Sequence, residues 1–295
     1  SKHSWFDKSC KDTIYCMFEM RQETDYVTHH IQKVVGFFAA MRNFAEELET
    51  ANHQVIYYKI NDEKNVQNLT ENLKTLIKEY AIEKFEYLAP DEFRLDRQLS
   101  EFSSSLNIPN QVFSTEHFYT ERDDLKTFFK GKKQFLMEIF YRNMRKKHQI
   151  LIVNEQPEGG KWNFDASNRK KWKGDVLIPT EINFDNNLEN VLSEIKKAGI
   201  ETIGKINAKY FEYPISRKQA LEQLEYFCEN LLVHFGDYQD AMHTDKIYLF
   251  HSRISFAMNT KMIAPKEIID TVLETYRKQE NYIDISQVEG FIRQI

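Results

Sequence analysis

Two hydroxyls flank an arginine in the stretch His251–Asn259, near the end of the 295-residue chain. Ser252 and Ser255 lie three residues apart, and Arg253 lies between them. A polar loop that leads into a helix can offer backbone N–H groups, hydroxyls and a guanidinium to a phosphate. Serines of this kind also cap helices, so residue types alone leave a phosphate site and a helix-capping loop both open.

The order of residues in this loop resembles the flavin-diphosphate loop of the photolyase/cryptochrome family, which begins Thr-Ser-Arg-Leu-Ser and ends Leu-Ser-Pro-Arg. Ser252, Arg253 and Ser255 match that pattern, Ile254 replaces its leucine conservatively, and Pro265 matches its proline. The resemblance implies that FAD lies against this loop and the helices around it. The implied flavin contacts are Ser252, Arg253, Ile254, Ser255, Tyr238 and Gln294, with Glu289 nearby.

A second group of polar side chains follows the first predicted strand, in Glu19–His30. His29 and His30 are adjacent, so a helix would point them about 100° apart and keep them from binding one ion together. From residue types alone they are a helix-start pair, one packed and one solvated. The spacing of Glu23, Tyr26 and His29, however, resembles the antenna site of the iron–sulfur bacterial cryptochrome/(6-4) photolyase branch. That resemblance implies a 6,7-dimethyl-8-ribityllumazine at these three residues, with the Glu23 carboxylate accepting hydrogen bonds from its N–H edge.

A polar loop with interleaved aromatic residues spans residues 154–173. Lysines beside aromatic rings suit a surface that holds phosphates and stacks on bases. The string Gly-Gly-Lys-Trp-Asn-Phe-Asp at residues 159–165 resembles the connector between antenna and flavin domains in the same branch. We expect four cations of this loop to approach DNA; alternatively, Trp162 and Phe164 merely pin the connector to the domain junction. The four cations are Lys161, Arg169, Lys170 and Lys171.

The elements that position these residues follow from hydrophobic periodicity. Strands are expected over residues 13–18, 54–60, 85–88 and 111–113, and helices over residues 26–49, 66–77 and 93–102. Strands that alternate with helices predict an α/β fold with a Rossmann-like parallel sheet covered on both faces. Ligands in such folds lie beyond the carboxyl ends of the strands, which is where the segment after the first strand falls.

The rest of the chain is predicted to be mainly helical. Residues 130–148 form a basic helix that we interpret as solvated, and a helix that begins after Ser216 is expected to end at Phe235-Gly236. Ser286 is expected to cap the last helix. We therefore divide the chain into three parts. They are an antenna domain (residues 1–128), a connector (129–213) and the first part of an all-α FAD-binding domain (214–295).

Composition narrows the class of protein. The net charge is −5, so any DNA contact has to come from a local basic patch. Cys10, Cys16 and Cys228 have no metal or redox spacing, which is typical of a reducing cytoplasm and predicts no metal ligands in this chain. No run of eighteen apolar residues is present, so we expect no transmembrane helix. We expect a cytoplasmic monomer, with self-association through exposed apolar surface as the alternative.

The resemblance implies part of a light-driven DNA photolyase-related flavoprotein, a carbon–carbon lyase. Such a protein repairs (6-4) or cyclobutane lesions in UV-damaged DNA by electron transfer from reduced FAD. The resemblance places the cysteines of a 4Fe-4S cluster and the catalytic histidine beyond Ile295. We therefore expect no catalytic residue here, and neither stoichiometric FAD binding nor repair by this chain alone.

Two other functions stay open. One is a blue-light signalling cryptochrome, which would use the same cofactors without repair. The other is a nucleotide-binding α/β module with a helical cap. The sequence contains neither a Gly-x-Gly-x-x-Gly nor a Gly-Lys-Ser/Thr loop, which disfavours this last interpretation.

Overall fold

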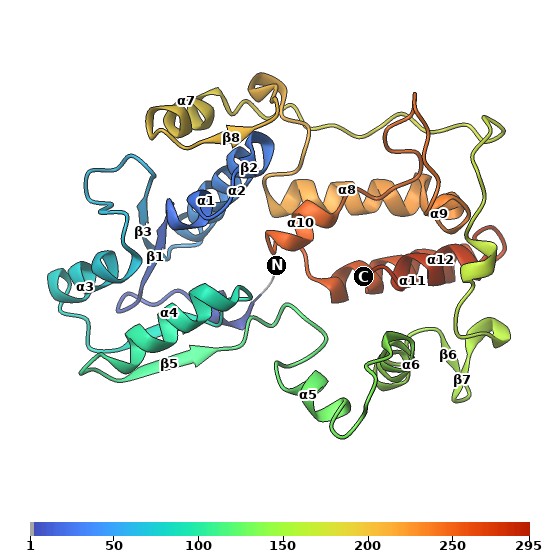
Figure 1. Ribbon diagram of the computed structural model, residues 1–295, viewed down its shortest axis with the longest axis horizontal. Coiled ribbons are helices and arrows are strands. Elements are labelled where there is room, and N and C mark those ends of the chain that lie inside the picture. The colour runs from blue at the N-terminus through green and yellow to red at the C-terminus, as the bar shows by residue number, and fades with distance from the viewer. Residues whose placement is uncertain (1–2) are drawn as a thin grey trace. The chain divides into compact units, whose positions relative to one another are not determined.

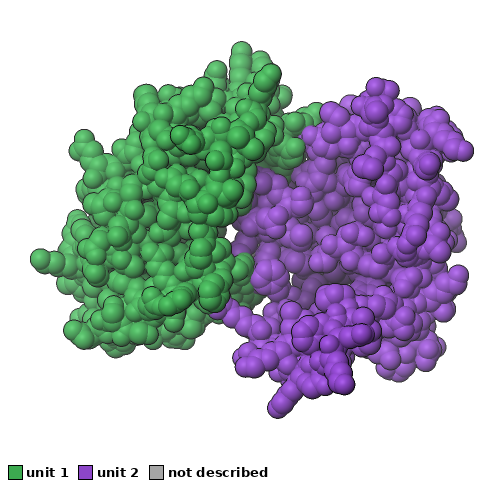
Figure 2. Space-filling model, in the orientation of Figure 1, with its two compact units in different colours: residues 1–116, 183–216 green, residues 117–182, 217–295 purple. Residues whose placement is uncertain are grey.

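The computed structural model describes residues 3–295, and contacts within the chain divide it into two compact units (Figure 2). Unit 1 comprises Ser1–Glu116 and Asn183–Ser216, and unit 2 comprises His117–Ile182 and Arg217–Ile295. Each unit therefore draws on two separate stretches of the sequence.

Unit 1 alternates parallel strands with helices (Figure 1). Strand β1 (Ile14–Phe18) pairs in parallel with β3 (Gln54–Tyr58), and β4 (Phe85–Leu88) pairs in parallel with β5 (Asn110–Phe113). The larger helices of the unit are α2 (Ile31–Thr50), α3 (Leu69–Glu79), α4 (Phe93–Ser104) and α7 (Glu189–Lys197). The predicted α/β class is confirmed.

Apolar side chains fill unit 1 in two clusters. One cluster lies between α2 and α7, where Val35 and Ile195 are almost completely buried. The other packs Phe18 and Tyr58 of the strands against Leu73 of α3. Each such side chain contributes about 1.5–3 kcal/mol when it is fully buried, so these clusters hold the strand ends in place.

The helix expected to begin at Tyr26 begins later. A short helix α1 (Gln22–Asp25) is followed by β2 (His29–His30), which pairs in parallel with β8 (Thr202–Ile203). The prediction that both histidines lie within a helix was wrong, because His30 ends the strand and caps α2. Its ring nitrogen Nδ1 accepts a hydrogen bond from the Gln32 N–H at 3.2 Å.

Unit 2 is mostly helical. Helices α8 (Arg217–Asn230), α9 (Leu232–Tyr238), α11 (Pro265–Lys278) and α12 (Ile285–Ile292) pack together. Before them in the chain come α5 (Asp124–Phe128), α6 (Met137–His148) and a small hairpin (Figure 1). The hairpin consists of β6 (Ile152–Val153) and β7 (Gln156–Pro157). Three short helices remain in this unit: η2 (Glu158–Gly160), η3 (Asp165–Ser167) and α10 (Ser255–Asn259).

Two predicted helix ends in unit 2 were wrong. The helix after Ser216 ends at Asn230, and Gly236 lies inside the next helix, α9. Gly236 lets α9 and α12 approach closely, since a Cβ atom there would stand 2.6 Å from the Ser286 carbonyl oxygen. Asp284, rather than Ser286, caps α12, because its carboxylate accepts from the Ser286 N–H at 2.8 Å.

Helix α6 is not solvated throughout, as the sequence had suggested. Most of its basic side chains are exposed, but the side chain of Arg145 is 1% exposed. The local sequence explains the difference, because the chain turns back after His148 and presents backbone carbonyls to the guanidinium. Lysine-rich composition alone does not reveal such acceptors.

The two units do not coincide with the three consecutive domains expected from the sequence, because residues 183–213 of the expected connector and 214–216 of the expected FAD-binding domain belong to unit 1. The assignment of those segments to antenna, connector and flavin domains stays a prediction. Within residues 3–295, none of the helices combines the length and apolar character needed to cross a membrane.

Candidate functional site

The turn Ser252–Ser255 carries two hydroxyls and the guanidinium of Arg253, and this guanidinium lies inside unit 2. Arg253 has a left-handed backbone (φ +58°), and its side chain is 7% exposed. Its Nη1 atom donates to the Ile182 carbonyl oxygen at 3.0 Å, and its guanidinium lies 4.1 Å from the ring centre of Tyr248. The carboxylate of Glu181 lies 3.9 Å away. The guanidinium is therefore held by protein groups in this structure.

The other predicted flavin contacts differ in exposure. Ser255 is exposed and Ser252 is half-buried, so a ligand could reach both hydroxyls. Ile254 is buried. Tyr238 is buried with its ring stacked on Phe250 at 5.1 Å, and burial raises the pKa of its hydroxyl. Gln294 is exposed at the end of α12.

The three predicted antenna residues of unit 1 lie close together. The rings of Tyr26 and His29 meet edge to face at 5.1 Å, and the guanidinium of Arg94 lies 4.0 Å from the Tyr26 ring centre. The Glu23 carboxylate lies 3.9 Å from the same guanidinium. The Tyr26 side chain is half exposed, so an aromatic surface and a carboxylate face solvent together.

His29 is the buried member of this antenna group. Burial lowers its pKa, and so does Lys33, whose ammonium donates to Nδ1 at 3.1 Å; Glu23 acts in the opposite direction. The ring therefore stays neutral near pH 7.

Glu19, at the carboxyl end of β1, is already satisfied by protein groups. Its side chain is fully buried and accepts from Arg42 at 2.7 and 3.0 Å. It also accepts from the Tyr57 hydroxyl and the Ile60 N–H, both at 2.8 Å. This carboxylate ties the ends of β1 and β3 together, and the ligand-facing groups of the segment begin after it.

The predicted connector string is fixed to the helices of unit 2 by Arg145. The Arg145 guanidinium donates to the carbonyl oxygens of Ile150 at 3.1 Å, Leu151 at 2.8 Å and Trp162 at 2.7 Å. A buried cation with three carbonyl acceptors is held in one orientation, since moving it would leave polar groups unsatisfied. Trp162 is thereby anchored to the end of α6.

Glu289 anchors the next residues of the string. Its carboxylate is fully buried in α12 and accepts from the Phe164 N–H at 3.0 Å and from the Tyr141 hydroxyl at 2.7 Å. Arg293 lies 3.4 Å from the same carboxylate. The interpretation of Glu289 as a flavin neighbour finds no support in these contacts, which join α6, the connector and α12.

Ion pairs complete the anchoring on both sides of the string. Glu158 accepts from Arg277 of α11 through two hydrogen bonds of 2.6 Å, and this pairing lowers the Glu158 pKa despite partial burial. Asp165 lies 3.3 Å from Arg293. Gly159 has φ +70°, which favours glycine where the string leaves the hairpin.

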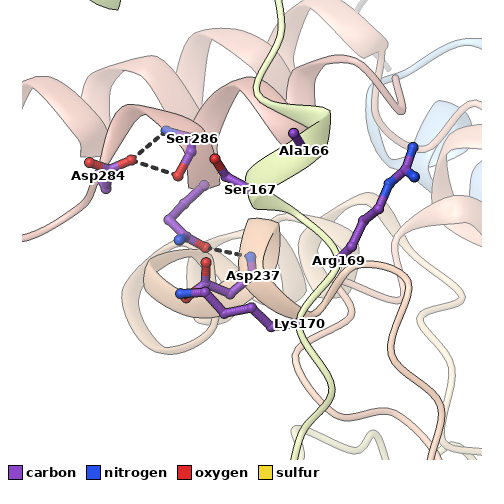
Figure 3. Close-up of a pocket in the computed structure, with 8 residues that line it drawn as sticks. Ala166, Ser167, Arg169, Lys170, Asp237, Asp284 and Ser286 are labelled. Carbon is purple, nitrogen blue, oxygen red and sulfur yellow. Dashed lines mark hydrogen bonds and ion pairs between the residues drawn. The ribbon is translucent and has the colours of Figure 1, made fainter.

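A cavity of about 570 Å³ opens beside the anchored string (Figure 3). Arg169 and Lys170, two of the predicted DNA contacts, line it together with acidic and hydroxyl groups of α9 and α12. In Figure 3 the Lys170 side chain lies beside Asp237, whereas Arg169 points away from it. The remaining lining residues are Ala166, Ser167, Asp237, Asp284, Ser286 and Gln287.

The charges in this cavity are partly paired. Lys170 donates to Asp237 at 2.8 Å, and this hydrogen bond raises the Lys170 pKa. Arg169 pairs with Asp165 one helical turn away. The Asp237 N–H donates to the Gln287 side-chain oxygen at 3.0 Å, so the amide group of Gln287 faces the cavity edge. Both cations remain more than half exposed and keep donors available for an anion.

The other two predicted DNA contacts lie on the surface. Lys161 is exposed, with its ammonium 6.0 Å from the Phe164 ring centre. Lys171 is exposed, and among the residues described it has no acidic partner within ion-pair distance. The structure thus brings Arg169 and Lys170 to one cavity and leaves Lys161 and Lys171 outside it.

The sequence did not identify the residues that hold this site in place. Arg145 was counted among solvated cations, and Glu289 was placed near a flavin. One signal was available, because Glu289 lies in an otherwise apolar stretch, Val288–Ile292, where a charged side chain needs a buried partner. The partners themselves, Tyr141 and the Phe164 N–H, are more than a hundred residues away.

Comparison with known proteins gives consistent matches. The family model described as "Deoxyribodipyrimidine photo-lyase-related protein" matches residues 1–211. A "(6-4) photolyase" from Agrobacterium fabrum (strain C58 / ATCC 33970) is 32% identical over 291 residues, which are 98% of this chain and 56% of that protein. "Uncharacterized protein R852" of Acanthamoeba polyphaga mimivirus is 26% identical over 157 residues, 52% of this chain and 78% of that protein.

A solved structure matches as well. It is the crystal structure of a bacterial class III photolyase from Agrobacterium tumefaciens, with a TM-score of 0.53 and 12% identity. The match covers 95% of this chain and 50% of that chain, and at this identity it supports the fold alone. The chain spans about half the length of the curated (6-4) photolyase and of the solved photolyase that it matches.

Proposed function

Because this chain belongs to the deoxyribodipyrimidine photo-lyase-related protein family, we propose that it is part of a light-driven enzyme that repairs UV-induced pyrimidine lesions in DNA. The observation that carries this proposal is the 32% identity to a (6-4) photolyase along 98% of the chain. The proposed substrate is a (6-4) or cyclobutane lesion, and the proposed compartment is the cytoplasm.

A flavin, FAD, is the cofactor proposed to supply the electron for repair. The residues of the turn fit it only in part. Ser252 and Ser255 keep accessible hydroxyls, whereas the Arg253 guanidinium already donates to the Ile182 carbonyl and lies against the Tyr248 ring. We therefore assign no reaction step to these residues. A 4Fe-4S cluster is proposed for the full-length protein, with ligands outside this chain.

The antenna proposal is supported by the chemistry of the group in unit 1. Glu23, Tyr26 and His29 combine a hydrogen-bond acceptor, an exposed ring and a neutral imidazole. A planar lumazine with N–H donors would find a stacking surface and a carboxylate there. The role of these side chains is to bind and orient the chromophore.

DNA is proposed to meet the connector at its cations. Arg145, Glu158 and Glu289 fix the backbone of the string, while Arg169 and Lys170 stay at a cavity mouth and Lys171 on the surface. Cations on a fixed backbone hold phosphates without an added cost of ordering the loop. Their proposed work is to position the backbone of damaged DNA.

Light-dependent loss of lesions tests the proposal. Full-length protein with reduced flavin is mixed with an oligonucleotide that carries one (6-4) lesion, and a second reaction carries one cyclobutane dimer. Repair of either lesion under blue light, and none in darkness, is the expected result. Tight binding without repair of either lesion would favour the signalling cryptochrome instead.

The connector is tested separately by the double variant Lys170→Ala/Lys171→Ala. We expect weaker DNA binding, with a salt dependence that falls by about one unit for each phosphate that the variant no longer neutralises. The matched control is Lys218→Ala, which removes an exposed lysine at the start of α8. An unchanged salt dependence of DNA binding in the double variant would mean that Lys170 and Lys171 do not contact DNA phosphates.

A further inference from the structure

A second basic surface of unit 2 lies between α5 and α6. All eight residues from Lys130 to Met137 are exposed. Phe135 is 69% exposed, Leu136 50% and Met137 63%. We call these eight residues the Lys130–Met137 tip. Contiguous exposed apolar side chains with polar residues around them are a feature of contact sites.

The tip stands on a rigid aromatic base. The rings of Phe128 and Phe129 meet edge to face at 4.9 Å, and Phe140 of α6 contacts both, at 5.3 and 6.0 Å. Phe135 packs on Phe129 at 5.1 Å. The ammonium of Lys132 lies 3.8 Å from the ring centre of Phe128. The apolar edge is thus held in position before any partner arrives.

The charge of the tip has one sign. Two acids near the tip are already paired within the unit, Glu138 with Arg142 at 2.8 Å and Asp124 with Lys147 at 3.3 Å. Five lysines around the tip have no acidic partner within ion-pair distance among residues 3–295. They are Lys126, Lys130, Lys132, Lys133 and Lys146.

We propose that the Lys130–Met137 tip is a second DNA-contact surface, with Lys130 and Lys133 on phosphates and the Phe135–Met137 edge against bases. This inference rests on the proposed function in one respect, namely that DNA is the substrate. Clustered lysines suit a polyanion, and apolar side chains placed among cations occur where a protein leans against unstacked bases. The tip would hold the duplex open or grip an unpaired stretch beside it.

A lipid surface fits the tip less well. Membrane-bound amphipathic helices present a broad apolar face along several turns. Here the next turns of α6 turn Tyr141 and Arg145 inward, toward Glu289 and the Trp162 carbonyl. The apolar edge consists of only three residues, Phe135–Met137, and follows three lysines. An edge of this length suits contact with one base step better than burial in a membrane.

Fluorescence anisotropy with full-length protein tests this surface. The probes are a matched duplex and the same duplex with a three-nucleotide unpaired bubble that contains 2-aminopurine. Phe135→Ala/Leu136→Ala is expected to weaken binding to the bubble about tenfold and to reduce the rise in 2-aminopurine fluorescence. Lys130→Ala/Lys133→Ala is expected to lower the salt slope by about two units.

Matched controls separate these effects from unfolding. Ile247→Ala removes an apolar side chain that is 81% exposed elsewhere in unit 2, and Lys218→Ala removes an exposed cation. Both are expected to bind like the wild type. Thermal unfolding of every variant is recorded, and Phe135→Leu serves as a variant that keeps an apolar tip if the double variant fails to fold.

The outcomes distinguish the tip from the connector. If the tip variants bind DNA like the wild type while Lys170→Ala/Lys171→Ala binds more weakly, the tip is not a DNA-contact surface. The proposed function would still stand. No binding of either probe by the wild type would overturn both. Phe135-dependent binding to vesicles of anionic phospholipid, or Phe135-dependent dimerisation, without an effect on DNA would also overturn this assignment.

Discussion

The turn at Ser252–Ser255 and the connector at residues 158–171 both belong to unit 2, yet they use their charges in opposite ways. In the turn, Arg253 points inward and donates to the Ile182 carbonyl. At residues 158–171, the inward charges come from neighbouring helices, as with Arg145 of α6, and Arg169 and Lys170 of the loop itself stay outside. The same residue type therefore serves as structure in one region and as a candidate ligand contact in the other.

The difference lies in which backbone acceptors each arginine meets. A guanidinium has five donors and no acceptor, so it readily donates to backbone carbonyls within its reach. Ile182 provides one such carbonyl beside the turn, and Ile150, Leu151 and Trp162 provide three beside α6. Arg169 meets only the exposed Asp165 carboxylate, which leaves it near the surface.

Arg145→Met is the change that tests this comparison most severely. It removes the guanidinium donors from the carbonyl oxygens of Ile150, Leu151 and Trp162, of which Leu151 keeps the Glu158 N–H. It also removes a fully buried side chain that lies beside Trp162. We expect a loss of about 3–5 kcal/mol in the free energy of unfolding, measured by urea titration. Arg142→Met is the control, since Arg142 is exposed, forms its ion pair with Glu138 on the same helix and lies 5.7 Å from the Trp162 ring centre without donating to a buried carbonyl. A loss below about 1 kcal/mol for Arg145→Met would contradict the anchoring role.

Glu289→Gln should have the next largest effect. The amide can accept only one of the two hydrogen bonds that Tyr141 and the Phe164 N–H now donate, and it gives up the charge facing Arg293. We expect a loss of about 2–3 kcal/mol in the free energy of unfolding. Adding Tyr141→Phe to this variant should cost less than Tyr141→Phe alone. Fully additive losses would show that Tyr141 and Glu289 do not act together.

Local pattern was enough to predict the α/β class and most strands and helices of unit 1, because the apolar residues there repeat at strand or helix spacing. The family resemblance, rather than local pattern, predicted Glu23, Tyr26 and His29 as antenna contacts, and the fold brings these side chains close together. Sequence could not show that Arg253 turns inward, since its acceptor Ile182 is 71 residues away. The anchoring roles of Arg145 and Glu289 depend in the same way on carbonyls and N–H groups placed by the fold.

Arg253→Lys distinguishes a structural role of the Arg253 guanidinium from a contact with flavin. If the guanidinium is structural, a lysine cannot reproduce its contacts with both Ile182 and Tyr248, and stability should fall by about 1–2 kcal/mol with flavin content unchanged. If it contacts flavin instead, the flavin content of full-length protein should fall while stability is kept. Urea titration and the absorbance near the flavin band measure the two quantities on the same sample. The structure predicts the first result.

The smallest expected effect comes from His251, next to the turn. Burial lowers the pKa of its imidazole, and Asp240 acts in the opposite direction. As the pH falls below about 6.5, the unfolded chain takes up this proton before the folded protein does, so stability is lost on acidification. His251→Gln should therefore flatten the fall in stability between pH 7 and pH 5, measured by urea titration at each pH.

The control for this titration is His243→Gln, which replaces an exposed histidine of the same unit. It should leave the fall in stability on acidification in place, because it keeps the buried His251 unchanged. If the free energy of unfolding changes equally with pH in the wild type and in His251→Gln, the His251 side chain is solvated in the folded protein. The segment beside the turn would then be open to solvent like the connector, and the contrast between an inward-facing turn and an outward-facing loop would rest on Arg253 alone.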